Sequence, residues 1–385
     1  MNQKIYLDYA ATTPLDPRVT QTMLPYFSIK FGNASSVHAF GQQAEAALEA
    51  SRQSVAQALN CAHNEIIFTS GGSESDNLAL RGVAFAERKR RQANHILISA
   101  VEHPAISRTA EQLAHEFDFE LENLPVDEFG CVDPDVVNAR LRDNTAVVSV
   151  MYANNEIGTI NAIAEIGTLC RRRGVPFHTD AVQAAAYLPV DVAALNVDLL
   201  SIGAHKFYGP KGVGALYIRT GTPILPVQTG GEQESGLRAG TYNIPYIVGL
   251  AEALQLTQNE RRERHEKLRP MRDRIIGRVL EDIPAARLTG HPIHRLPNHA
   301  SFVFDGVDGN ALLMMLDIAG YACSSGSACK TGDPEPSGVL LALGLPRSWA
   351  LGSLRVTLGK DTSPQEVEAF LDDLPGIIER VRKLD

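Results

Sequence analysis

The sequence contains no run of about eighteen consecutive apolar residues, the length that a membrane-spanning helix needs. Its N-terminus enters alternating polar and apolar positions without the apolar stretch of a secretory signal, so we expect a cytoplasmic protein. Basic residues are not in excess: 36 lysines and arginines face 45 aspartates and glutamates, giving a formal net charge of -9. This balance argues against direct binding to nucleic acid.

Cysteine is scarce, and its spacing excludes two common roles. An odd number, five in 385 residues, favours free thiols in a reducing compartment over a disulfide framework. No two cysteines form a C-x-x-C pair, since the nearest two, Cys323 and Cys329, are six positions apart. We therefore expect no zinc site and assign no metal ligand.

The length of the chain predicts one large and one smaller domain. From about residue 44 to 295, helical patterns alternate with short apolar runs, which indicates an α/β domain with a largely parallel sheet. The charged residues 259–268 are interpreted as a solvated helix face joining the domains. Ser363 and Glu366 form a capping box at the start of the last helix. The expected buried strands are residues 65–69, 95–100, 146–152, 175–179, 198–202 and 214–218.

Several of these strands end directly in polar or glycine-rich segments. In open α/β sheets ligands bind outside the carboxyl ends of the strands, so we expect these segments to converge on one site. The segments are residues 70–73, 101–103, 153–156, 180 and 204–206.

Lys206 follows an apolar strand and precedes a turn rich in glycine and proline. An amine that forms a Schiff base must be desolvated enough to be neutral part of the time, and this position suits that need. A surface lysine on a loop is the commoner interpretation of any single lysine. The context that favours a functional lysine is Asp180, which ends another apolar strand 26 residues earlier.

A carboxylate such as Asp180 is what pyridoxal phosphate requires beside its pyridine nitrogen, because a protonated nitrogen lets the ring accept electrons. Gln183, on the next turn, is placed to donate to the phenolate oxygen of that cofactor. The alternative is that Asp180 only caps a helix.

Gly72 and Ser73 belong to a strand, glycine-rich turn and helix start that offers backbone N–H groups to a phosphate. The segment matches neither G-x-G-x-x-G nor the P-loop pattern, which disfavours a dinucleotide or ATP. Ordinary turn chemistry also explains two adjacent glycines. His103 is placed to stack over a cofactor ring and exchange protons, or is a structural histidine. Asn155 has the same ambiguity between ligand and turn residue.

Taken together, these segments resemble the cysteine desulfurases of the class V aminotransferase family. The resemblance runs collinearly from about residue 5 to 380 and includes the mobile catalytic loop of one subgroup. Further motifs that carry it are residues 6–14 (YLDYAATTP), 32–38 (GNASSVH), 236–241 (GLRAGT) and 323–329 (CSSGSAC).

The resemblance implies a fold similar to aspartate aminotransferase. A large domain, residues 16–259, would hold a mostly parallel sheet of seven strands, and a smaller α+β domain would combine residues 1–15 and 260–385. The implied cofactor is pyridoxal 5'-phosphate. The residues implied to bind it are Lys206 through a Schiff base, Asp180 at the pyridine nitrogen, His103 over the ring, Gln183 and Asn155 at the phenolate, Gly72, Ser73 and His205 at the phosphate, and Thr241 from the second subunit of a homodimer.

The implied reaction converts L-cysteine to L-alanine. Arg355 would hold the substrate carboxylate, assisted by Asn155, and Cys329 would receive the sulfur as a persulfide. The sulfur would then pass to an acceptor such as an iron–sulfur scaffold or a tRNA-thiolating enzyme. Gly203 departs from the family pattern, which often has a phosphate-binding serine there. Cys323 is interpreted as an inert buried thiol rather than a persulfide relay.

Two other functions remain open. The first alternative is another pyridoxal-phosphate enzyme of the same family, such as a selenocysteine lyase or an aminotransferase. The second is a non-catalytic sulfur carrier or accessory subunit with the same fold. Cys329 distinguishes a desulfurase from an aminotransferase, because transamination has no use for this thiol.

Overall fold

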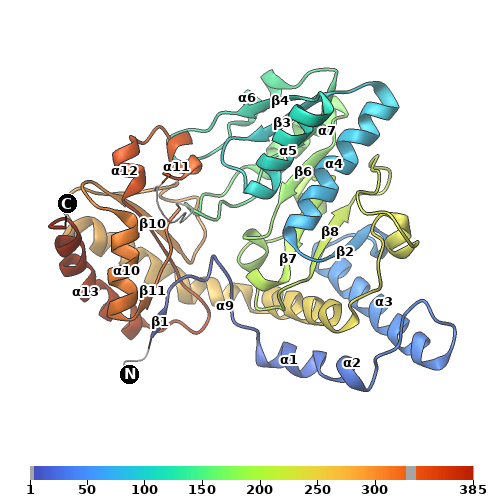
Figure 1. Cartoon of the computed structure of the whole chain (residues 1–385), viewed down its shortest axis with the longest axis horizontal. Helices are drawn as coiled ribbons and strands as arrows, with labels where there is room; N and C mark the ends of the chain where they lie inside the picture. Colours follow the sequence, from blue (N-terminus) through green and yellow to red (C-terminus); the bar gives the residue numbers. More distant parts are fainter. Residues whose placement is uncertain (1–3, 327–334, 385) are drawn as a thin grey trace.

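A computed structural model describes residues 4–326 and 335–384. Its largest sheet has seven strands in the order β2-β8-β7-β6-β5-β3-β4 (Figure 1). β8 is antiparallel to both of its neighbours, and the remaining pairs are parallel. Six strands therefore run in one direction, which confirms the mostly parallel sheet. The strands are β2 (Ile66–Thr69), β3 (His95–Ser99), β4 (Glu120–Leu124), β5 (Thr145–Ser149), β6 (Phe177–Asp180), β7 (Leu199–Gly203) and β8 (Gly214–Ile218).

Helices cover both faces of this sheet, so its strands other than the edge strand β4 are fully buried. Adjacent residues face opposite layers: Phe68 packs into one hydrophobic core and Ile67 into the other. One layer contains α4 (Gly72–Arg91) and α5 (Pro104–Phe117) (Figure 1). The opposite layer contains α3 (Ala39–Leu59), α7 (Ile163–Arg173) and the first half of α9 (Ile244–Asp282). Short helices α6 (Pro134–Arg140) and α8 (Val192–Leu195) lie in the connections.

All six predicted strands are present, with ends that shift by a few residues. The sequence analysis missed β4, the edge strand that pairs only with β3. Its residues are mostly solvent-exposed or half-buried, and only Leu124 is fully buried. An edge strand of this composition lacks the continuous apolar run that marks a central strand.

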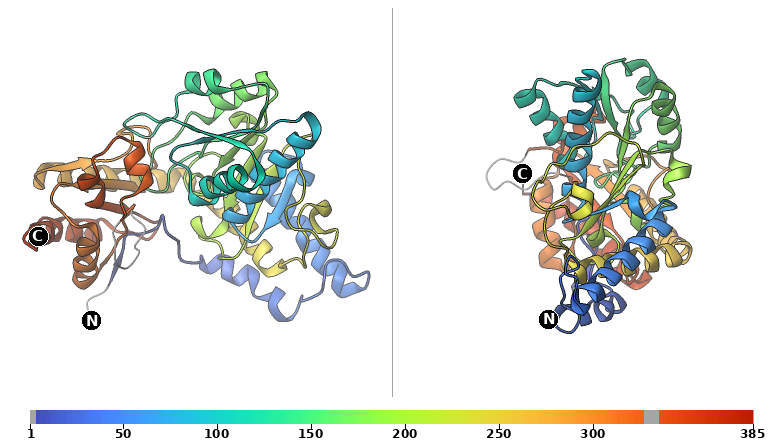
Figure 2. Two further views of the ribbon diagram at one scale, coloured as in Figure 1. Left: turned by 45° about the horizontal axis from the view of Figure 1, so that its top comes forward. Right: turned by 90° about the vertical axis from the view of Figure 1, so that its right-hand side faces the viewer.

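The C-terminal part of the chain forms a second unit that also takes in the N-terminal strand (Figures 1 and 2). An antiparallel sheet joins β12 (Ser353–Thr357), β10 (His299–Phe304) and β9 (Ala286–Leu288). Strand β1 (Ile5–Tyr6) pairs in parallel with β11 (Tyr321–Ala322). The helices of this part are α10 (Gly309–Ala319), α11 (Gly338–Ala342), α12 (Arg347–Leu351) and α13 (Pro364–Val381).

The predicted capping box at the start of α13 is confirmed. The Ser363 hydroxyl accepts from the Glu366 N–H at 3.2 Å, and the Glu366 carboxylate accepts from the Ser363 N–H at 2.7 Å. The charged residues 259–268 lie within α9, which extends over 39 residues. They are not uniformly solvated, since Arg264 is buried with its guanidinium 4.9 Å from the centre of the Tyr208 ring.

The N-terminal helices α1 (Pro17–Met23) and α2 (Pro25–Ser28) lie below α9 in Figure 1 and leave large apolar side chains exposed. Within residues 4–326 and 335–384, no helix combines the length and the apolarity needed to cross a membrane.

Candidate active site

A cavity of about 240 Å³ opens at the carboxyl ends of the parallel strands. All five polar segments that were expected to converge contribute to its wall, which confirms that expectation. The N-terminal segment closes one side through Ala10 and Ala11, and Met151 is a further apolar neighbour. The predicted site residues in the wall are Gly72, Ser73, His103, Asn155, Asp180, Gln183, His205, Lys206 and Arg355.

At one end of the cavity the start of α4 packs against glycines of β7 and β8. A Cβ atom on Gly214 would lie 2.6 Å from the carbonyl carbon of Gly71, and one on Gly203 would lie 3.3 Å from the nitrogen of Gly72. Because neither glycine has a side chain, the turn at Gly71 and Gly72 packs directly against the ends of β7 and β8. The first N–H groups of a 20-residue helix then face the cavity without a capping side chain.

The Lys206 amine is enclosed by the backbone of the N-terminal segment. Its Nζ donates to the carbonyls of Ala10 at 2.6 Å and Ala11 at 2.8 Å. Burial, reinforced by the positive charge of Arg355, lowers the pKa of this lysine to about 8, although Asp180 opposes the shift. The amine is therefore neutral for part of the time near neutral pH, as Schiff-base chemistry requires.

Asp180 and His103 lie near each other inside the cavity. One Asp180 oxygen accepts from the Val182 N–H at 2.8 Å, and burial raises the pKa of the carboxyl group against the opposing effect of His103. Burial lowers the pKa of His103, whose Nδ1 accepts from the Ala105 N–H at 3.1 Å and caps α5. A neutral His103 ring consequently carries its proton on Nε2.

Asp76 is a cavity residue that the sequence analysis missed. It is almost fully buried, and its Oδ1 has no hydrogen-bond partner among the described residues. Burial, followed by the negative charge of Asp180, raises the pKa of Asp76 well above its usual range. Ligand atoms of Asp76, His103 and Asp180 all lie within 4.8 Å of one another. The available signal was its spacing, one helical turn after Gly72, which places both residues on the same side of α4.

Gln183 and His205 hold the N-terminal segment against the site. The Gln183 amide donates to the carbonyl of Ala10 at 2.8 Å. The His205 Nδ1 lies 3.2 Å from the Thr12 hydroxyl oxygen. Burial and the nearby lysine charges lower the pKa of His205 to about 4, so this ring is neutral at pH 7.

Arg355 closes the far end of the cavity and is already engaged by a carboxylate of the chain. Its Nη2 donates to Asp8 at 2.9 Å and its Nη1 donates to the backbone carbonyl of Asn155 at 3.0 Å. The buried Nε has no partner within the described part of the chain. The Arg355 guanidinium is therefore held in a fixed position at the cavity, and its Nε–H still lacks a hydrogen-bond acceptor among the residues described.

Thr241 and Cys329 are the predicted residues that remain. Thr241 is exposed and lines no part of the cavity. Cys329 lies outside the described residues. Cys323 is half-buried near Asp8, and desolvation raises the pKa of its thiol well above the ordinary value. A neutral thiol is consistent with the inert role expected for Cys323.

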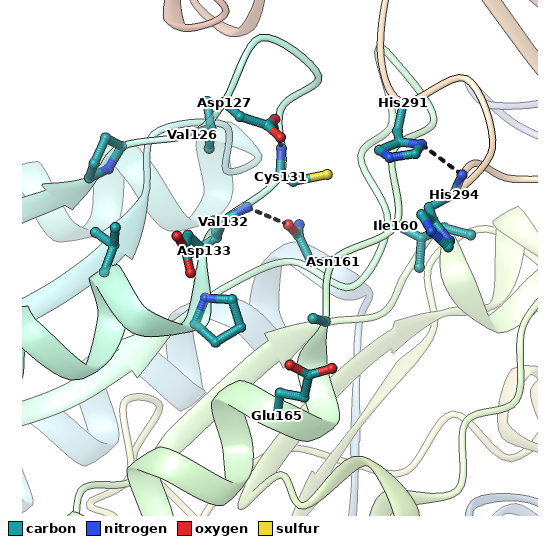
Figure 3. A pocket seen from close by; sticks show the side chains of 14 residues that line it. Val126, Asp127, Cys131, Val132, Asp133, Ile160, Asn161, Glu165, His291 and His294 are labelled. Atoms are coloured by element: carbon teal, nitrogen blue, oxygen red, sulfur yellow. Dashed lines mark hydrogen bonds between the residues drawn. The ribbon is translucent and has the colours of Figure 1, made fainter.

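A larger hollow of about 760 Å³ lies elsewhere and shares no residue with this cavity (Figure 3). Asp127, Asp133 and Glu165 contribute carboxylates to its wall, and such a wall repels an anionic phosphate. Cys131 also lines it, but burial raises the pKa of this thiol to about 11. We therefore place the chemistry at Lys206.

Pyridoxal phosphate fits the cavity around Lys206. The buried carboxyls of Asp180 and Asp76 supply the negative charge that a protonated pyridine nitrogen requires, although the Asp76 Oδ1 also lies 3.6 Å from His178 Nε2. The glycine-lined helix start suits the phosphate at the other end. Fold and cavity together define a pyridoxal-phosphate-dependent enzyme.

The comparisons with known proteins narrow this class. The chain belongs to the aminotransferase class-V family, whose family model matches residues 5–370, and its relatives within that family are cysteine desulfurases. It is 46% identical to cysteine desulfurase IscS of Clostridium botulinum, over the whole chain and 96% of that protein. It is 45% identical to cysteine desulfurase IscS of Methanosarcina thermophila, over the whole chain and 94% of that protein.

The fold agrees with this assignment. A solved NifS-like protein superposes with a TM-score of 0.91 at 34% identity, over 98% of this chain and all of that one. The chain is thus a pyridoxal-phosphate enzyme of the cysteine desulfurase type, as the sequence predicted.

Proposed function

We propose that the chain transfers the sulfur of L-cysteine to Cys329 and releases L-alanine. The observation that carries this proposal is the enclosed Lys206 amine beside Asp180, in the same cavity as the Arg355 guanidinium. The substrate class comes from the relatives, which are named cysteine desulfurases. The assignment of individual residues rests on their positions in the cavity.

The cofactor, when bound, supplies a ring that accepts the electron pair of the substrate α-carbon. Lys206 would hold it covalently and Asp180 would keep its ring nitrogen protonated. The remaining contacts follow the cavity wall: His103 beside the ring, Gln183 and Asn155 at the phenolate oxygen, and Gly72, Ser73 and His205 at the phosphate.

Lys206 and His103 are the groups that would move protons. With a pKa of about 8, the Lys206 amine has a neutral fraction that can accept the substrate α-proton and deliver it again. His103 offers an N–H on Nε2, and this proton can be exchanged with the thiol of the substrate or of Cys329.

Arg355 would bind the substrate carboxylate through two of its three guanidinium nitrogens. Because Nη2 now contacts Asp8 at 2.9 Å, the substrate must share or displace this internal partner. The competition gives Asp8 a part in setting how tightly L-cysteine binds.

In the sulfur step, the thiolate of Cys329 would attack the sulfur of the substrate. A sulfur–sulfur bond forms and the carbon–sulfur bond breaks. The electron pair of that bond stays on the substrate carbon, which takes up a proton and becomes the methyl group of alanine. The persulfide on Cys329 would then pass its outer sulfur to an acceptor such as an iron–sulfur scaffold or a tRNA-thiolating enzyme.

Labelled cysteine and mass mapping test this assignment. We expect one additional sulfur on Cys329 and none on Cys323. A Cys329→Ala variant should still change the cofactor absorbance when cysteine is added but should lose alanine release. Full alanine release from this variant would refute Cys329 as acceptor, and absent cofactor absorbance in the wild type would revive the non-catalytic alternative.

We further propose a homodimer in which Thr241 reaches the phosphate of the neighbouring subunit. Exposed apolar side chains on α1, α2 and the residues that follow support a protein partner at this face. They include Leu24, Phe27, Ile29 and Phe31, which are 50%, 54%, 71% and 64% exposed.

Subunit mixing tests the crossed arrangement. A Lys206→Ala chain and a Thr241→Ala chain are each expected to be impaired. A mixed dimer would contain one site with both wild-type residues only if Thr241 acts across the interface. Recovered activity on mixing is therefore expected, and its absence in a demonstrated mixed dimer would refute the crossed contact.

We propose the division into residues 16–259 as the large domain and residues 1–15 with 260–385 as the small one. The pairing of β1 with β11 supports the inclusion of the N-terminus in the small domain.

We also propose that the protein acts in the cytoplasm. Capture of the acceptor on the Cys329 persulfide, before and after reduction, would identify which sulfur pathway it serves.

A further inference from the structure

Glu156 has a role that the proposed chemistry does not yet use. It lies in the turn after β5, next to Asn155 in the cavity wall. The buried amide of Asn154 fixes this turn, since its Oδ1 accepts from the N–H groups of Glu156 at 2.7 Å and Ile157 at 2.9 Å. Its Nδ2 donates to the carbonyl of Val101 at 2.9 Å. The backbone of Glu156 is therefore fixed relative to the strand ends that carry the site.

The Glu156 side chain contacts two residues that are far apart from it in sequence. Its Oε2 accepts a hydrogen bond from the Ser337 hydroxyl. A Cβ atom on Gly326 would lie only 2.5 Å from the same Oε2 and 3.3 Å from the Cβ of Ser337. Gly326 and Ser337 are thus held side by side against one carboxylate, and they flank the stretch of sequence that contains Cys329.

Ser337 is itself a firm anchor. Its side chain is buried, and its hydroxyl oxygen accepts from the N–H groups of Val339 at 3.1 Å and Leu340 at 3.3 Å, which caps α11. The single hydroxyl proton is given to Glu156. The turn after β5 and the start of α11 are therefore joined through this one bond, with Ile157 and Val339 packed in a common apolar cluster.

We propose that Glu156 is a positioning residue for sulfur transfer: its carboxylate holds both ends of the Cys329-bearing stretch beside the cavity. The inference rests on the proposed role of Cys329 as sulfur acceptor. Glu156 acts through Ser337 and Gly326.

The hydrogen bond between the Ser337 hydroxyl and the Glu156 carboxylate is expected to depend on pH. Burial raises the pKa of Glu156 to about 7, against the opposing effects of the Ser337 hydrogen bond and of Arg355 on β12. Arg355 is itself paired with Asp8, and His299 on β10 has a pKa well below its usual range and stays neutral. A carboxylate accepts a hydrogen bond more strongly than a neutral carboxyl group. The anchor is therefore strongest above pH 7 and weakens below it.

Glu156→Gln tests the proposal in the holoenzyme, because it keeps the shape and an acceptor oxygen but removes the charge. Single-turnover formation of the Cys329 persulfide should be about fivefold slower than in the wild type at pH 8, as expected when a charged hydrogen bond becomes neutral. The ratio of the two rates should approach one at pH 6, where wild-type Glu156 is protonated. The cofactor absorbance change on mixing with cysteine should be unaltered.

Glu165→Gln is the matched control, since this carboxylate lines the separate hollow of Figure 3. Ser337→Ala is the second variant: it should slow persulfide formation, and adding Glu156→Gln to it should cause little further loss. A rate ratio that stays constant from pH 6 to pH 8, or an unchanged rate, would overturn the proposal. A wild type that forms no persulfide on Cys329 would instead refute the proposed function.

Discussion

Replacing Asp76 by asparagine tests whether two buried carboxylates repel each other beneath the cofactor site. Oxygen atoms of Asp76 and Asp180 lie within 4.8 Å, so at an effective dielectric constant of about 20 two full charges would repel by roughly 3 kcal/mol. A carboxyl group with a raised folded-state pKa destabilises the fold increasingly as the pH rises above its unfolded value. Asp76→Asn removes this cost.

The apoenzyme is the form to measure, because no ring nitrogen then neutralises the pair. For 385 residues, an entropy of unfolding of about 0.8 kcal/mol/K converts roughly 3 kcal/mol into an increase of about 3–4 °C in Tm as an upper value. We expect this gain at pH 8 and almost none at pH ~3, where both carboxyl groups are largely protonated in the folded and unfolded states.

Glu45→Gln on the exposed face of α3 is the control, since it removes one negative charge without changing a buried pair. Differential scanning calorimetry at several pH values measures the difference. An Asp76→Asn apoenzyme that melts below the wild type at pH 8 would refute the reasoning, because it would mean that the Asp76 carboxylate is stabilised in the fold.

Two further outcomes follow from the cavity. Arg355→Lys loses the bidentate contact with the substrate carboxylate and should raise KM for cysteine by about 10- to 100-fold with cofactor absorbance intact; an unchanged KM would contradict this role. Gly214→Ala drives a methyl group against the backbone of Gly71 and should weaken cofactor binding to the apoenzyme by at least about tenfold, as a fluorescence titration would measure. Gly277→Ala, in open space on α9, is its control and should bind the cofactor normally.

Local pattern was sufficient for the central sheet and for the residues at its strand ends. A strand buried on both faces is mostly apolar, so β2, β3, β5, β7 and β8 are visible as nearly continuous apolar runs, and β6 is recognised from the apolar residues that lead into it. Parallel strands end at one edge, so the polar residues after them had to meet there. Lys206, Asp180 and His103 were found in this way, and the family resemblance ordered them into one site.

The resemblance, rather than any local pattern, placed Thr241 and Arg355. Neither position has a signal in its own neighbourhood, because one lies on an exposed loop and the other inside an ordinary buried strand. The edge strand β4 and the buried Arg264 were misjudged for a related reason. Their burial depends on what packs against them and not on the periodicity of their own segments.

Within the site, the sequence determined which side chains stand at the strand ends, and the structure showed that Lys206 is desolvated. Only the tertiary structure showed that Asp76 lies beside Asp180, that Asp8 occupies the fork of Arg355 across 347 positions of sequence, and that Glu156 joins Gly326 to Ser337. These are contacts between segments remote in the chain, and a periodic pattern carries no information about them. The packing of the N- and C-terminal segments on the sheet brings Asp8 to Arg355 and Ser337 to Glu156.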